Sequence, residues 1–231
     1  MGPSAASASG ATGSVARHQP HLLITPFGEG DVIRVDTAVR RHLEKVLRIV
    51  AGTVTYTDGS GLIGEGEYDA GSIRRGTERI IRPPERLAVA VAPPHEVTRA
   101  RFLVEKLAEL AVTELVWLRT AHLEGRPPRP EKTAAWVRSA VEQSRGAWAM
   151  RVGGPVNLDE VASLGTPVFA EAGSPALSQL PALATPVLCV GPEGGFASGE
   201  IPEDALRIGL ASTVLRVETA AISGAVLLRS R

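Results

Sequence analysis

A glycine-rich segment at 191–195 has the sequence GPEGG and surrounds Glu193 with three glycines and a proline. It follows the apolar run 186–190, which is typical of a buried strand, and ligands of open parallel sheets collect beyond the carboxyl ends of the strands. Glycine permits positive φ and lets a backbone approach a ligand closely, while proline removes one donor and stiffens the turn. The segment is therefore predicted to present main-chain N–H and C=O groups to a ligand at short range.

The spacing of these glycines also limits the chemistry of that ligand. It matches neither a dinucleotide fingerprint nor a P-loop, and no lysine follows. Because Glu193 would repel a phosphate, the segment favours a neutral or cationic ligand. The alternative is an ordinary strand-to-helix turn, since glycine turns are common.

A second segment, 210–221, combines an apolar run with charged residues. A strand is expected at 213–217, and Arg216, Glu218 and Thr219 stand where it ends. The helix expected next begins with small residues, which permit close approach to another element or to a second subunit. A core helix whose first turn is ion-paired is the alternative. Two such strand ends in one domain indicate a shared site.

The elements that position these segments follow from the periodicity of the chain after residue 83. Apolar strands are expected at 87–91, 114–118, 167–170, 186–190 and 213–217. Helices are expected within 98–112, 132–145 and 218–228, and in a Pro/Ser-rich stretch before 186. Continuous apolar strands that alternate with helices imply a parallel sheet covered on both faces.

The chain before residue 83 has a different pattern, rich in short strands. These are expected at 32–35, 53–57, 62–68 and 78–81. One helix interrupts them, with an apolar face predicted from Leu43, Val46, Leu47 and Val50. We therefore predict three parts: an Ala/Ser/Gly-rich disordered tail at 1–18, a small β-barrel domain at 19–82 and an α/β domain at 83–231.

Composition excludes several classes of protein. The 231 residues are 44% apolar, as in an ordinary globular protein, and no apolar stretch is long enough to cross a bilayer, so a cytoplasmic location is expected. Cys189 is the single cysteine, which excludes disulfides within the chain, and five scattered histidines make a metal site improbable. Net charge is zero, yet 99–151 holds ten basic against six acidic residues, which suits a polyanion; a solvated helix face is the alternative.

Several stretches together resemble one family. VGPEGGF followed by VLRVETA resembles the signature of the bacterial 16S ribosomal RNA (uracil-N3)-methyltransferases, which belong to the SPOUT superfamily. EKLAELAV, ELVWL and AVEQSR are similar to the helix, strand and Glu-Gln-Ser helix of that family, and RRHLEKVLRIVAGTVTYTDGSG is similar to its PUA-like barrel. The likeness covers about 20–230.

The resemblance implies a SPOUT-type trefoil-knotted α/β domain preceded by a small PUA-like RNA-binding barrel. It implies a homodimer that uses S-adenosylmethionine to methylate uridine N3 in 16S ribosomal RNA or the small ribosomal subunit, in ribosome biogenesis. The implied cofactor-binding residues are Ala170, Glu171, Val190, Gly191, Glu193, Gly194, Gly195, Leu210, Leu215 and Arg216. Neither a metal nor a membrane is implied.

For the reaction, we expect Arg216 to stabilise the charge that develops on the uracil oxygens, because a guanidinium donates in a fixed fork and stays charged. Glu218 and Glu193 are candidate bases, and Gln143 is a candidate to orient the uracil edge. The expected RNA-binding residues are Arg40, Arg41, Lys45, Arg48, Arg138 and Arg145.

The chain departs from the family pattern in three places. EVTRARF stands where a Lys-Gly pair is usual, EQSRGAWAMRV replaces the common EQSGR, and the interval 197–210 is short, which predicts a trimmed helix there. Two rival functions follow: a degenerate member that binds ribosomal RNA without catalysis, and a SPOUT enzyme that methylates a ribose 2′-hydroxyl. The PUA-like start and the Glu-Gln-Ser helix argue against the second.

Overall fold

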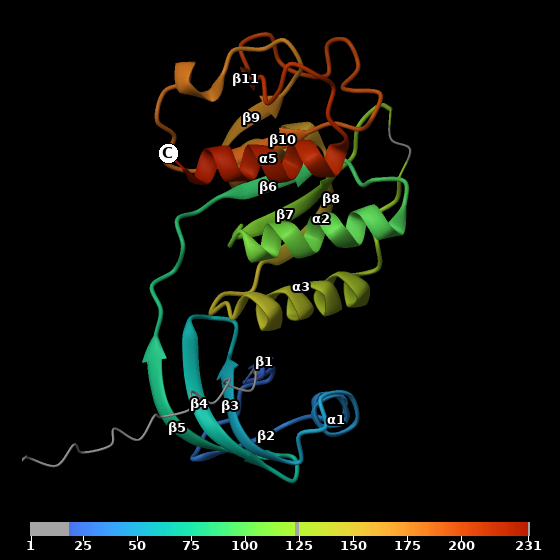
Figure 1. Ribbon diagram of the computed structural model, residues 1–231. Coiled ribbons are helices and arrows are strands. Elements are labelled where there is room, and N and C mark those ends of the chain that lie inside the picture. Colours follow the sequence, from blue (N-terminus) through green and yellow to red (C-terminus); the bar gives the residue numbers. More distant parts are fainter. Residues whose placement is uncertain (1–18, 123–124, 231) are drawn as a thin grey trace, which may run out of the picture.

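The computed structural model describes residues 19–122 and 125–230, which form two sheets with separate hydrophobic cores (Figure 1). The predicted disordered tail, 1–18, lies outside these residues. The segment 81–87 joins the two sheets, and the domain boundary near residue 82 stays a prediction. None of the helices in the described residues is long and apolar enough to cross a membrane.

The first sheet has five strands in the order β1-β3-β4-β5-β2. Their bounds are β1 His21–Leu23, β2 Val32–Arg34, β3 Ala51–Thr57, β4 Leu62–Asp69 and β5 Ser72–Ile80. β1 pairs with β3 in parallel and the other pairs are antiparallel. β1 and β2 stand at the two ends of this order, and the sheet is a half-barrel, in agreement with the small barrel-like domain that was expected.

Aromatic packing explains the glycines of β4. The buried Tyr56 side chain crosses the inner face of the strand, where a Cβ on Gly64 would lie only 2.3 Å from the ring atom Cζ. Gly64 therefore makes room for this ring, while a Cβ on Gly66 would lie 2.4 Å from the Arg74 carbonyl oxygen of the neighbouring strand, so both glycines serve packing rather than a turn.

The helix of this domain is shorter than its sequence pattern suggests. α1 spans Thr37–Arg41, with the Asp36 carboxylate accepting a hydrogen bond from the Val39 amide at 2.7 Å, and a π-helical turn, His42–Val46, follows it. Its buried side is formed by Val39 and Leu43.

The predicted apolar face was wrong beyond Leu43. Val46, Leu47 and Val50 are 64%, 43% and 69% exposed. The chain leaves the helix at Leu47, and Arg48 adopts a positive φ of 58°, so the later residues do not continue the periodic face.

The second sheet has six parallel strands in the order β11-β9-β10-β6-β7-β8. The strands are β6 Ala88–Val91, β7 Glu114–Leu118, β8 Arg151–Val156, β9 Thr166–Ala170, β10 Pro186–Val190 and β11 Leu206–Ile208. The helices are α2 Val97–Glu109, α3 Pro130–Ser144, α4 Leu158–Val161 and α5 Val217–Arg229. Most of the predicted strands and the three long helices are confirmed within a few residues.

Both faces of this sheet are buried, as predicted. In β10, Leu188 and Val190 pack with α2, α3 and α5, whereas Val187 and Cys189 face the opposite core. The three long helices lie together on one face (Figure 1), and the opposite core takes its cover from α4 and from the segment that holds Phe196 and Ile201. The Phe196 ring packs edge-on against Phe169 of β9, with 5.6 Å between centroids.

Three sequence predictions about the last third of the chain were wrong. The expected strand at 213–217 is instead irregular chain up to the start of α5, and the strand of this region is β11. The Pro/Ser-rich stretch before β10 holds only the 3₁₀ turn Leu177–Gln179, because its prolines interrupt helical hydrogen bonding. The short interval 197–205 contains turns and no helix.

Candidate active site

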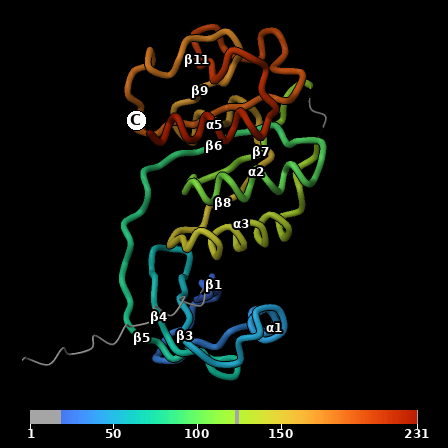
Figure 2. The backbone as a smooth tube through the Cα atoms, viewed as in Figure 1, coloured from blue at the N-terminus to red at the C-terminus, as the bar shows by residue number. Residues whose placement is uncertain are grey.

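A cavity of about 240 Å³ opens where three loops meet beyond the carboxyl ends of β9, β10 and β11. These loops lie together at one end of the sheet, next to the first turn of α5 (Figure 2). The lining residues are Ala170, Glu171, Ala172, Val190, Gly191, Pro192, Glu193, Gly195, Phe196, Leu210, Ala211, Thr213, Val214, Leu215, Val217 and Ala220. The two segments singled out in the sequence thus share one cavity.

Backbone hydrogen bonds join two of the loops and close a turn within the third. The Glu171 amide donates to the Ile208 carbonyl at 3.0 Å, and the Gly209 amide donates to the Pro175 carbonyl at 2.8 Å. These bonds tie the chain after β11 to the loop after β9. In the glycine segment, the Gly195 amide donates to the Pro192 carbonyl at 2.8 Å and closes a tight turn. The cavity is therefore built from connections that follow three parallel strands and are held by backbone hydrogen bonds.

Two of the glycines have separate structural reasons. Gly195 has a φ of +72°, a conformation that favours glycine. A Cβ on Gly191 would lie 3.0 Å from the Phe196 ring, so this glycine lets the loop pack against the aromatic core. The glycine-rich sequence thus brings the backbone close to the cavity without a side chain in the way.

Most of the residues predicted to bind a cofactor line this cavity. The exceptions are Gly194, which lies near the His122 side chain, and Arg216, whose neighbours Leu215 and Val217 line the cavity. Sequence reasoning missed Pro192, Phe196 and the exposed lip at 211–214. The available signal was that these residues lie within or directly beside the two segments already singled out in the sequence.

Arg99 of α2 is a site residue that the sequence did not reveal. Its guanidinium reaches three carboxylates: Nη1 lies 3.4 Å from Oε1 of Glu193, Nη2 lies 3.4 Å from Oε1 of Glu96, and Nε lies 3.9 Å from Oε1 of Glu218. One arginine therefore links the glycine loop to the first turn of α5. No motif marked it, since Glu193 and Glu218 come from distant parts of the chain.

Glu218 is buried, and it lies behind the cavity wall rather than on it. Its Oε2 atom has no hydrogen-bond partner among the described residues, while its other oxygen faces Arg99. Its place in the first turn of α5 favours a negative charge, because helix N-termini carry positive partial charge. Of the two candidate bases, Glu193 lines the cavity and Glu218 does not.

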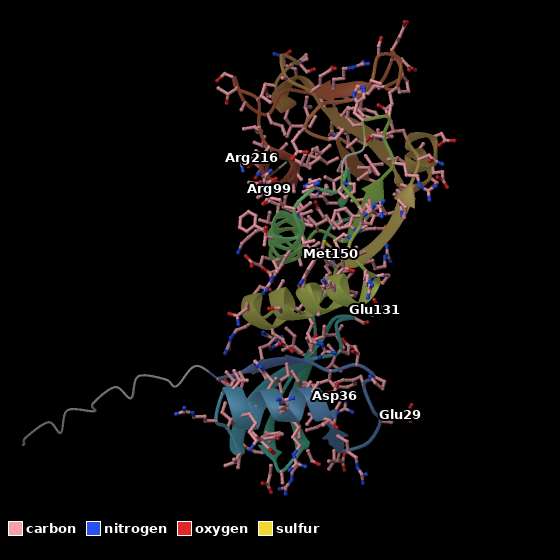
Figure 3. The ribbon with its side chains drawn as sticks, turned by 90° about the vertical axis from the view of Figure 1, so that its right-hand side faces the viewer. Glu29, Asp36, Arg99, Glu131, Met150 and Arg216 are labelled. Carbon is pink, nitrogen blue, oxygen red and sulfur yellow. The ribbon has the colours of Figure 1, made fainter. Side chains whose placement is uncertain are left out.

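Arg216 stands at the N-cap of α5 with an exposed side chain. Within the described residues its guanidinium takes part in no hydrogen bond or ion pair. Figure 3 shows Arg216 and Arg99 on the same side of the molecule, on the packed helices α5 and α2. Arg216 is therefore a charged group available to a ligand at the mouth of the cavity.

Gln143 is not brought to this cavity. It is exposed near the end of α3, which runs back from the carboxyl end of β7 toward the start of β8. The end of α3 thus lies at the opposite edge of the parallel sheet from the cavity (Figure 1). Within one chain, Gln143 cannot contact a base bound beside Arg216.

The predicted RNA-binding residues fall into two groups. Arg41, Lys45 and Arg48 are exposed without an ion pair in the described part of the chain, while Arg40 pairs with Glu44 at 2.9 Å. The two arginines of α3 bind the first domain instead. Arg138 donates to the Leu23 carbonyl and to Thr25 Oγ1, and Arg145 donates to the Gln19 carbonyl.

The described residues contain no group of three or more His, Cys, Asp and Glu side chains that could hold a metal ion. The sequence from 82 to 229 matches the model of a family described as RNA methyltransferase domain. The chain belongs to this family. The cavity lies within the matched part of the chain. No curated protein matches the chain in sequence.

Solved structures similar to this chain show the same fold along nearly its whole length. A probable rRNA-methyltransferase from Porphyromonas gingivalis has a TM-score of 0.81 at 21% identity and covers 91% of this chain and 97% of its own. Ribosomal RNA small subunit methyltransferase E from Neisseria gonorrhoeae, bound to S-adenosyl methionine, has a TM-score of 0.80 at 21% identity, with 92% and 98% covered. A putative methyltransferase from Legionella pneumophila, also with bound SAM, has a TM-score of 0.77 at 21% identity, with 92% and 96% covered.

These findings confirm the fold class that the sequence resemblance implied. The chain is an α/β protein with a half-barrel sheet followed by an all-parallel sheet, the fold of the similar methyltransferase structures. The trefoil knot stays a prediction.

Proposed function

We propose that this protein uses S-adenosylmethionine to methylate N3 of a uridine in 16S ribosomal RNA of the small ribosomal subunit. The observation that carries the proposal is the cavity at the ends of β9, β10 and β11, built within a domain of the RNA methyltransferase family. Two proteins of the same fold have this cofactor bound.

The residues of the cavity fit such a cofactor. Val190, Leu210 and Leu215 offer apolar walls to an adenine ring, and the backbone of 191–195 offers polar groups to its edge. Glu171 and Glu193 add carboxylates that tolerate a cationic sulfonium. When bound, S-adenosylmethionine would supply an electrophilic methyl group.

The chain's own residues then act on the uracil. N3 must lose its proton, and the negative charge spreads to the two flanking carbonyl oxygens. Arg216, unpaired within the described residues, is placed to donate hydrogen bonds to those oxygens. Glu193 is better placed than Glu218 to accept the proton, because only Glu193 lines the cavity. N3 is a Watson–Crick atom, so the target base must be unpaired or flipped.

RNA binding is assigned to the half-barrel domain. Its exposed cations Arg41, Lys45 and Arg48 would contact phosphates, and such contacts set the affinity for RNA and its salt dependence rather than the choice of sequence.

We also propose a homodimer. The lip of the cavity carries Val214, which is 85% exposed, and a second subunit would cover it.

The test measures methyl transfer from labelled S-adenosylmethionine to small subunits and to protein-free 16S ribosomal RNA, followed by nucleoside mass spectrometry. We expect 3-methyluridine as the product. Calorimetric titration measures the affinity for the cofactor in parallel. Arg216→Ala should retain most of this affinity but lower the turnover rate by at least about 100-fold, the typical loss when one donor to a developing oxyanion is removed.

Other outcomes separate the rivals. Cofactor binding without any methylated nucleoside in either RNA would contradict the proposal. RNA binding with no affinity for the cofactor would support a non-catalytic member of the family, and a 2′-O-methylated product would support the ribose methyltransferase. Equal loss of cofactor affinity and turnover in Arg216→Ala would mean that Arg216 only builds the pocket.

A further inference from the structure

A second cavity lies at the junction of the two domains, and the proposed methyl transfer makes no use of it. It has a volume of about 210 Å³ and lies between β1, the segment after α1 and the end of α3. Its lining residues are Gln19, Pro20, His21, Leu22, His42, Leu47, Ile49, Glu142, Gln143 and Arg145. None of these lines the first cavity, which opens at the opposite edge of the parallel sheet.

The walls of this junction pocket combine an apolar surface with one free amide. Leu22, Leu47 and Ile49 supply the apolar part, and Leu47 is partly exposed although it is a large apolar residue. The exposed Gln143 amide makes no hydrogen bond within the described residues, so both its donors and its acceptor are available. The pocket can therefore hold a flat apolar group and hydrogen-bond its edge.

Two other polar residues of the pocket, His21 and Glu142, are already engaged. His21 is buried, with Nδ1 2.9 Å from Thr55 Oγ1 and Nε2 3.1 Å from the Gly146 carbonyl oxygen, and burial lowers its pKa. Glu142 accepts a hydrogen bond from the Leu23 amide at 3.2 Å, and burial raises its pKa. Both groups therefore form a fixed wall and leave recognition to Gln143 and to His42, whose ring is exposed.

The charge around the pocket is positive and largely unbalanced. The segment that supplies His42 and Leu47 also carries Arg41, Lys45 and Arg48, all exposed and without an ion pair in the described part of the chain. Arg145 adds a further cation on the wall. An occupant with an anionic backbone is favoured over an apolar protein segment, which would leave these charges uncompensated.

We propose that the junction pocket receives one base of the RNA, at a nucleotide other than the one that is methylated. Gln143 hydrogen-bonds the edge of this base, Leu47 and Ile49 contact its face, and Arg41, Lys45 and Arg48 contact the neighbouring phosphates. The pocket has a volume of about 210 Å³, and its apolar wall beside a free amide matches the flat face and polar edge of a base. This inference rests on the proposed RNA substrate but not on methyl transfer.

The experiment uses the full chain and fluorescein-labelled single-stranded RNA oligonucleotides of each homopolymer sequence, read by fluorescence anisotropy. Gln143→Ala should weaken binding to the preferred sequence about 3- to 10-fold, the loss of one or two neutral hydrogen bonds, and reduce the preference among bases. Leu47→Asp, which places a negative charge on the wall, should weaken binding to every sequence by more than about 10-fold.

Two controls separate base recognition from general binding. Gln179→Ala alters an exposed glutamine on the loop between β9 and β10 and should change nothing. Arg41→Ala should lower affinity for all sequences alike and reduce the salt dependence by about one phosphate contact. Cofactor affinity, measured by calorimetry, should be unchanged in Gln143→Ala, because the two cavities share no residue.

Cross-linking with 4-thiouridine-substituted 16S ribosomal RNA then locates the contact by peptide mass spectrometry. Cross-links within 42–49 or 142–145 support the proposal, even if the protein transfers no methyl group. Unchanged affinity and base preference in Gln143→Ala, or cross-links confined to other surfaces, would overturn it. An active enzyme whose Gln143→Ala variant keeps the same KM for RNA would leave the proposed function standing and reject the junction pocket.

Discussion

Replacing Arg99 by methionine tests how the glycine loop is held to α5. The guanidinium is 25% exposed and faces Glu218, whose side chain is 10% exposed, at 3.9 Å. A charge pair near 4 Å at an effective dielectric constant of about 20 interacts by about 4 kcal/mol before desolvation is counted. Glu193 and Glu96 are more exposed, so each of their pairs contributes about 1 kcal/mol or less.

The expected net effect is a loss of about 2 kcal/mol in the free energy of unfolding. It lies below the 3–5 kcal/mol typical of breaking a fully buried pair, because water reaches part of Arg99. For a chain of this length that corresponds to a fall in Tm of about 4–8 °C. Cofactor affinity should fall about 3- to 10-fold as well, since Glu193 loses its anchor at the cavity rim.

The assay is chemical denaturation with calorimetric titration, and it includes a matched control on the same helix. Arg101 is 57% exposed and pairs with Glu105 at 2.8 Å, so Arg101→Met should cost less than about 0.5 kcal/mol. In the single variant Arg99→Met, the buried Glu218 carboxylate loses its partner, and adding Glu218→Gln removes this unpaired charge. The loss in free energy of unfolding in the double variant should therefore be smaller, by at least about 1 kcal/mol, than the sum of the losses in the two single variants. Additive losses, or equal effects of Arg99→Met and Arg101→Met, would refute the reasoning.

Three further predictions concern buried groups. Burial lowers the pKa of His21, so the neutral imidazole contributes its full stability above about pH 6.5, and this stability is lost as the pH falls toward the lowered pKa. His21→Gln should therefore flatten the decline in the free energy of unfolding between neutral pH and about pH 5.5. An unchanged pH profile in the variant would contradict this prediction. A Cβ on Gly224 would lie 2.6 Å from Leu188 Cδ2, so Gly224→Ala should cost about 1–3 kcal/mol by denaturant titration; a stability equal to that of the parent protein would show that Leu188 moves aside freely. Burial raises the pKa of the Cys189 thiol to about 12, so a thiol reagent should react only after unfolding, and rapid labelling of the native protein would disprove its burial.

The local sequence pattern was sufficient to predict the parallel sheet and the place of the cavity at the ends of its strands. The apolar runs in β6, β7, β9 and β10 lie where they were expected, because strands buried on both faces must be apolar throughout. The segment GPEGG lines the cavity because glycines after such a strand allow a close backbone approach.

Other features depended on contacts between distant residues. The apolar run at 213–217 is equally compatible with a strand and with a cavity wall, and only the pairing of β11 with β9 decided between them. The exposure of Leu47 and Val50 followed from the end of the helical turn at Val46, which periodicity does not mark.

The arrangement of charged side chains was also decided by tertiary structure. Arg99 meets Glu193 and Glu218, which follow it by 94 and 119 positions, and Gln143 lies away from the cavity at the end of α3. Sequence periodicity records which side of an element is buried, because burial of apolar area acts on each residue separately. It does not record which elements become neighbours, since strand order is chosen by the packing of the whole sheet.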